Sequence, residues 1–124
     1  MDYGFARGQI EMLNGHLLHE KGHTGTGIRI AVIDAGYEGF LQSPAFDSLR
    51  NSPRLLGTFN YLTNDTNVFS GWGSHGTSVL SIMAANLPDT LVGTAFDAYR
   101  ANLNLKEGSW ILQLAGDING VYKF

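Results

Sequence analysis

Cysteine is absent from the 124-residue chain, which excludes disulfides and thiolate chemistry. Long apolar runs are absent too: nowhere do about 18 apolar residues follow one another, so we expect no membrane-spanning helix. The N-terminus, Met1–Gly4, lacks the basic and apolar regions of a signal peptide, so we expect any export signal to lie outside this sequence. A chain of this length makes one domain at most and is large enough to bury a core.

Runs of like charge are also missing. Eight Lys and Arg residues stand against 11 Asp and Glu residues, which gives a net charge of −3. This composition predicts neither a nucleic-acid partner nor a basic patch for a membrane surface. Glycine, by contrast, is abundant: its 16 residues indicate tight turns and close backbone approaches rather than a helical bundle.

The most informative stretch is G-I-R-I-A-V-I-D-A-G at residues 27–36. Its apolar run is rich in β-branched side chains and has glycine on both sides, which predicts a buried parallel strand. Asp34 ends that run. Functional groups gather at the carboxyl ends of parallel strands, because the sheet fixes their position while the loops vary. Asp34 is therefore a candidate functional residue; the alternative is a solvated aspartate that opens an ordinary loop.

A second informative stretch is G-W-G-S-H-G-T-S at residues 71–78, which continues into an apolar segment. Val79, Ile82 and Met83 recur at helical spacing and predict a buried helix with His75 in or beside its first turn. An imidazole held there is a candidate general base. The alternative makes His75 a capping residue, with Gly76 needed only for close packing.

Other segments predict supporting elements. An apolar stripe within Gln9–Glu20 predicts one amphipathic helix that Gly22 closes; its members are Ile10, Leu13, Leu17 and Leu18. We expect a short helix around Ala45–Leu49, a second strand within Arg54–Leu62, and a turn or short strand at Leu91–Ala95.

Three histidines fall in or just after the first predicted helix. His19 and His23 lie four residues apart, a spacing that could place two imidazoles on one face for a metal. Gly22 should end the helix before His23, and no third ligand is evident. We therefore predict that His16, His19 and His23 are surface residues and that the chain has no metal site there.

Two motifs together carry a family resemblance. A-V-I-D-A-G at residues 31–36, followed by H-G-T-S-V at residues 75–79, resembles the aspartate and histidine motifs of the subtilisin-like serine peptidases. G-H-T-G-T-G at residues 22–27 is similar to that family's lead-in to its first strand. G-T-A at residues 93–95 is similar to the turn after its histidine helix. The resemblance covers about residues 9–97.

The resemblance implies an α/β, parallel-sheet, three-layer fold that is incomplete in this chain, and a polypeptide substrate. Asp34 would accept the Nδ1 proton of His75, and His75 would take the proton of a serine nucleophile. The family's G-T-S-M-A serine motif and its oxyanion-hole asparagine are not found here. Ser78 belongs to the histidine motif and could hardly present its Oγ to a substrate while His75 faces Asp34.

The resemblance has limits along the chain. Ala35, Leu80, Ser81 and Phe96 depart from the family's usual residues. From Tyr99 onward the sequence no longer resembles the family. We therefore predict that residues 1–98 are the N-terminal portion of a catalytic domain and that residues 99–124 are a divergent tail not native to the fold. The chain alone, without a nucleophile, is expected to be inactive.

Further implications and alternatives follow from the same motifs. The resemblance implies a secreted or cell-envelope protein and extends to calcium, which many relatives bind.

A pseudo-peptidase that keeps the fold for binding is one alternative. A nucleotide-phosphate-binding domain is another, because D-A-G at residues 34–36 is similar to a D-x-G phosphate turn. Against it, no G-x-G-x-x-G is present, and Gly25 and Gly27 precede the strand.

Overall fold

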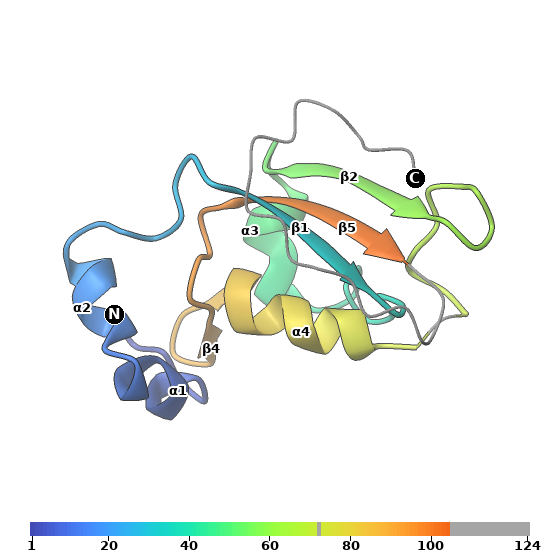
Figure 1. The fold of residues 1–124 in the computed structure, drawn as a ribbon. Coiled ribbons are helices and arrows are strands. Elements are labelled where there is room, and N and C mark those ends of the chain that lie inside the picture. Colours follow the sequence, from blue (N-terminus) through green and yellow to red (C-terminus); the bar gives the residue numbers. More distant parts are fainter. Residues whose placement is uncertain (72, 105–124) are drawn as a thin grey trace.

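The computed structural model describes residues 1–71 and 73–104 and has a mixed α/β architecture (Figure 1). The helices and strands in chain order are α1 Arg7–Met12, α2 Gly15–Glu20, β1 Arg29–Asp34, the 3-10 helix η1 Pro44–Phe46, α3 Asp47–Arg50, β2 Leu55–Asn60, α4 His75–Ala84, β3 Asn86–Leu87, β4 Leu91–Val92 and β5 Tyr99–Asn104. The predicted α/β class is confirmed; the three-layer arrangement of the sequence prediction stays a prediction.

A three-stranded parallel sheet forms the centre of the molecule, with the order β1-β5-β2 (Figure 1). Val32 of β1 and Thr58 of β2 both lie beside Asn102 of β5. The strands β1 and β2, which come first in the sequence, are therefore not neighbours. The predicted strands within residues 27–36 and 54–62 correspond to β1 and β2, and the predicted short helix corresponds to η1 and α3.

The predicted boundary after residue 98 falls immediately before β5. Residues Tyr99–Asn104 pair with β1 on one side and β2 on the other, so the described part of the predicted tail lies in the middle of the sheet. The remainder of that tail, residues 105–124, lies outside the described residues. Its assignment as a divergent tail stays a prediction.

The helix α4 runs along the sheet and contributes to its hydrophobic core (Figure 1). The buried core side chains are Val32, Tyr37, Phe40, Phe46, Leu49, Val68, Leu80 and Ala84. The predicted burial of the stripe holds in part: Val79 and Met83 are partly buried against this core, whereas Ile82 is 53% exposed. The fully buried positions of the helix are Gly76, Leu80 and Ala84. Apolar side chains occupy both flanks of this helix, so their spacing alone leaves its rotation about the axis undetermined.

The predicted single helix over Gln9–Glu20 is wrong. Asn14 has a left-handed backbone, with φ of 56°, and separates α1 from α2. Asparagine tolerates this conformation better than most residues, which explains the break. The break rotates the predicted stripe out of register: Ile10 is buried, whereas Leu13 is 73% exposed. A second small core joins Ile10 to the β4 region through Tyr3, Ala6, Val92 and Phe96.

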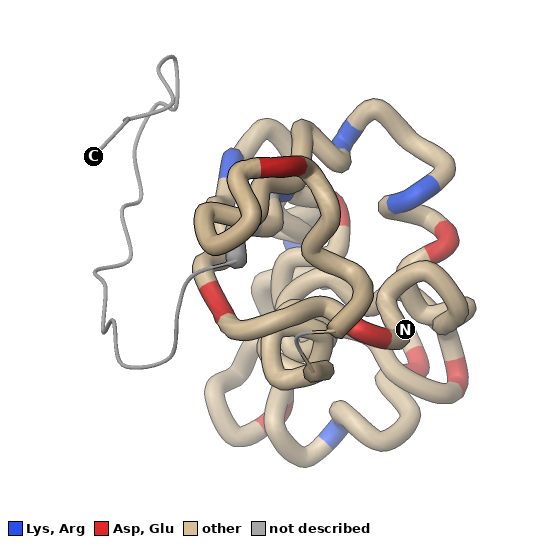
Figure 2. Tube along the Cα trace, turned by 90° about the vertical axis from the view of Figure 1, so that its right-hand side faces the viewer, with Lys and Arg blue, Asp and Glu red and all other residues tan. Residues whose placement is uncertain are grey.

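Charged residues are interspersed along the trace rather than gathered in one continuous stretch (Figure 2). Within residues 1–71 and 73–104, no helix combines the length and the apolar character that crossing a membrane requires.

Candidate active site

Asp34 is the last residue of β1, where the apolar strand meets a glycine-containing loop. Its side chain is only 14% exposed. The Oδ1 atom accepts a hydrogen bond from the backbone N–H of Ala35 at 2.6 Å. The same oxygen lies 2.6 Å from Nδ1 of His75. A carboxylate oxygen can only accept here, so Nδ1 is the donor in this pair.

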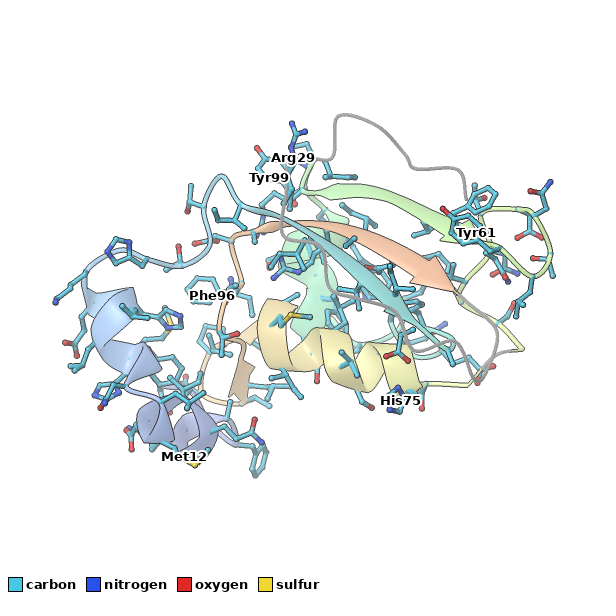
Figure 3. The ribbon with its side chains drawn as sticks, in the orientation of Figure 1. Met12, Arg29, Tyr61, His75, Phe96 and Tyr99 are labelled. Atoms are coloured by element: carbon cyan, nitrogen blue, oxygen red, sulfur yellow. The ribbon has the colours of Figure 1, made fainter. Side chains whose placement is uncertain are left out.

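His75 is the first residue of α4, and its side chain is 74% exposed. Figure 3 shows it at the beginning of that helix, at the end remote from Phe96. With Nδ1 donating to Asp34, the second ring nitrogen, Nε2, carries the lone pair of the neutral imidazole. The structure thus brings together the two residues that the sequence singled out.

Gly76 sets the distance between α4 and the loop that follows Asp34. Its backbone N–H donates to the carbonyl of Gly36 at 2.9 Å. A Cβ atom at position 76 would lie 2.6 Å from that same oxygen and 2.8 Å from the ring of Tyr37. Only glycine fits there without a shift of the backbone. The close packing of Gly76 against the loop after Asp34 therefore also places the neighbouring His75.

A second set of contacts ties the same two segments together. Glu38 donates its backbone N–H to the carbonyl of Gly73 at 3.0 Å and accepts the Oγ1 hydrogen bond of Thr77 at 2.8 Å on its own carbonyl. Its carboxylate Oε1 accepts from the backbone N–H of Gly71 at 2.7 Å. The sequence prediction assigned no role to Glu38. The sequence signal for a turn close to Glu38's partners was the pair of glycines Gly71 and Gly73.

Ser78 makes a local hydrogen bond rather than one to His75: its Oγ donates to the carbonyl of Ser74 at 3.3 Å. This bond back to the previous turn is the ordinary behaviour of a serine inside a helix. That Ser78 is not the nucleophile stays a prediction.

His19 lies partly buried at the surface, and its ring is held by neighbouring groups. Its Nδ1 lies 2.9 Å from the hydroxyl of Tyr3, its Nε2 lies 2.9 Å from the carbonyl of Thr94, and its ring meets that of Phe96 edge-on at 5.2 Å. Within the described residues, no group of three or more His, Cys, Asp or Glu side chains could hold a metal ion.

The fold and the pair define an α/β protein with an acid at a strand end and an imidazole at an adjoining helix start. No family model matches the chain. Subtilisin E of Bacillus subtilis (strain 168) is 27% identical over 113 residues, which cover 90% of this chain and 27% of that protein. The subtilisin of Bacillus pumilus is 30% identical over 76 residues, which cover 61% of this chain and 24% of that protein.

A further relative, subtilisin J of Geobacillus stearothermophilus, is 30% identical over 76 residues, 61% of this chain and 18% of that protein. The chain is thus distantly similar to subtilisins and spans about a quarter or less of their length. An alignment that covers 90% of the chain extends beyond Tyr99 wherever it begins. The similarity is therefore not confined to the segment before β5.

Proposed function

We propose that Asp34 and His75 are the orienting acid and the general base of a subtilisin-like serine endopeptidase. The observation that carries this proposal is the 2.6 Å contact between Asp34 Oδ1 and His75 Nδ1. The similarity to subtilisins supports the same reaction class. A subtilisin-like fold and a secreted or cell-envelope location belong to the same proposal.

The proposed chemistry follows from the direction of this hydrogen bond. Asp34 holds the Nδ1–H tautomer, so the Nε2 lone pair accepts the Oγ proton of a serine as that oxygen attacks the substrate carbonyl carbon. The imidazolium that forms is stabilised by the carboxylate beside it. Nε2–H then protonates the leaving amine as the C–N bond breaks, and water hydrolyses the acyl-enzyme by the same proton route.

The nucleophile and the oxyanion donors have no counterpart among residues 1–124, so we propose that polypeptide outside these residues supplies them. The match covers only 27% and 24% of the two subtilisins, so most of their length has no counterpart in this chain. On this proposal, residues 1–124 alone hydrolyse no peptide bond.

The first test uses the gene and its full product. We expect a G-T-S-M-A sequence in one frame of the coding region beyond codon 124, and we expect the product that contains it to react with a fluorophosphonate probe. His75→Ala should abolish this labelling, because no base then removes the serine proton. Absence of the motif from every frame, or full labelling of His75→Ala, would contradict the proposal. An unlabelled product that still contains the motif would favour the pseudo-peptidase alternative.

The second test needs only the 124-residue chain. Nitrogen-15 NMR of the His75 ring should show the Nδ1–H tautomer in the wild type. In Asp34→Asn the side-chain amide can donate to Nδ1, so we expect the Nε2–H tautomer instead. His16 and His23 provide internal controls that should not change. A wild-type ring with its proton on Nε2 counts against the proposed role of the pair.

The phosphate-binding alternative gains no support from this geometry. Asp34 already accepts two hydrogen bonds, and its negative charge would repel a phosphate at the same loop. Protection of the chain from thermal unfolding by an ATP analogue would favour this alternative over the peptidase.

A further inference from the structure

Glu38 connects the two loops that present the candidate acid and base. It lies in the loop after β1, four residues beyond Asp34. The partners of its backbone and carboxylate, Gly71, Gly73 and Thr77, lie on both sides of His75 in the sequence. One residue of the acid-bearing loop therefore contacts the chain before and after the base.

The carboxylate contact is the one that depends on the side chain. Gly71 and Gly73 both have φ of +81°, a left-handed backbone conformation that favours glycine. The N–H of Gly71 is held by Oε1 of Glu38 at 2.7 Å. A hydrogen bond to an ionised acceptor is stronger than one between neutral groups, so this contact restrains the loop that leads into His75.

We propose that Glu38 is a positioning residue for the Asp34–His75 pair. Its carboxylate anchors the loop before α4 to the loop after β1, and so keeps His75 Nδ1 within hydrogen-bond distance of Asp34. The inference rests on the proposed function, because it concerns the same proton relay. The role proposed for Glu38 is to act on the relay through the placement of the imidazole.

The test compares three variants of the 124-residue chain by NMR. Glu38→Ala removes the acceptor, Glu38→Gln keeps an oxygen in its place, and Glu20→Ala removes an exposed carboxylate on α2 as a control. In Glu38→Ala we expect the Gly71 amide to exchange with water about tenfold faster, which corresponds to the loss of one such hydrogen bond. We also expect the His75 Nδ1 proton signal to weaken or disappear. Glu38→Gln should restore both, and Glu20→Ala should change neither.

Two results would overturn the inference. The first is a Glu38→Ala variant with a deprotected Gly71 amide but an unchanged His75 Nδ1 proton, which would make Glu38 a loop anchor only. The second is Glu38→Gln behaving as Glu38→Ala. Should Glu38→Ala fail to fold, Glu38→Asp shortens the side chain by one methylene and is judged by the same two signals. Absence of the His75 Nδ1–H signal from the wild type would instead count against the proposed function itself.

Discussion

The neighbouring strands β1 and β5 differ sharply in what they bury. Ile30 and Val32 of β1 face the core, and the residues beside them in β5 are Arg100 and Asn102, both with 0% exposure. Among the residues that the structure describes, the Asn102 side-chain amide has no hydrogen-bond partner on either its nitrogen or its oxygen, and the Arg100 Nε also has none. Backbone pairing with β1 and β2 thus holds β5 in the centre of the sheet, although burying its polar side chains costs free energy.

Arg100 is better compensated than Asn102, although it carries a charge. Its guanidinium donates to the carbonyl of Ala95 at 2.7 Å and to that of Tyr99 at 3.1 Å. Burial, with a smaller contribution from the nearby charge of Arg54, lowers the pKa of Arg100 to about 10. The charged form is therefore less favourable in the folded chain than in the unfolded one.

The largest effect is expected where β1 meets α4. Gly76→Ala should lower the free energy of unfolding by about 3 kcal/mol, because the new Cβ would collide with the Gly36 carbonyl. It should also eliminate the His75 Nδ1 proton signal. Urea denaturation and NMR measure the two effects. The control is Gly57→Ala in β2, where a Cβ meets nothing within 4 Å. Equal stability of the two variants would contradict the prediction.

The next-largest loss of stability is expected from the buried apolar side chains of β1. Val32→Ala removes two buried methyl groups from the core of β1 and should cost about 2 kcal/mol of unfolding free energy. Ile33→Ala, one residue further and 36% exposed, should cost less than half as much. Chemical denaturation of both variants gives the difference. A larger loss in Ile33→Ala would mean that the opposite face of β1 carries the packing.

The chain should become more stable when β5 is made as apolar as β1. Asn102→Leu keeps the branching of the side chain and removes two buried polar atoms that have no partner within residues 1–71 and 73–104. We expect the free energy of unfolding to rise by about 1–2 kcal/mol. The matched control is Asn60→Leu, because Asn60 is equally buried but hydrogen-bonds to the Asn67 carbonyl and the Leu62 N–H; it should be destabilising. A loss of stability in Asn102→Leu would disprove the prediction.

The smallest effect concerns the buried charge. Arg100→Met should stabilise the chain by about 1 kcal/mol near neutral pH, because a buried cation close to Arg54 is replaced by an apolar side chain. Above pH 10 the folded wild type loses the Arg100 proton, while the unfolded chain, in which burial does not lower the pKa of this guanidinium, retains it. The wild type then gains stability, so the advantage of the variant should shrink as pH rises through this range. A constant difference would contradict the pKa shift.

Local sequence patterns accounted for the elements that build the site. The apolar run before Asp34 predicted β1, and the helical spacing after His75 predicted α4, because each pattern is carried by residues close together in the sequence. The pairing of Asp34 with His75 came from two motifs considered together, since neither strand nor helix alone indicates its spatial neighbour. The roles of the two residues stay a proposal.

Other features depended on interactions that the sequence does not display. The polar side chains of Arg100 and Asn102 concealed β5, whose position follows from backbone pairing with two distant strands. The left-handed turn at Asn14 interrupted a helical pattern that continued through it in the sequence. The rotation of α4 followed from the contact of Gly76 with Gly36, which is long-range and therefore invisible to periodicity.

The strand order also determines when the sheet can form during synthesis. Because β5 separates β1 from β2, neither of the earlier strands has its sheet partner until residues 99–104 have left the ribosome. Closing a connection that long is entropically costly and slow. Until then the apolar side chains of β1 stay available to chaperones, and the described sheet depends on β5, the last of its three strands to be synthesised.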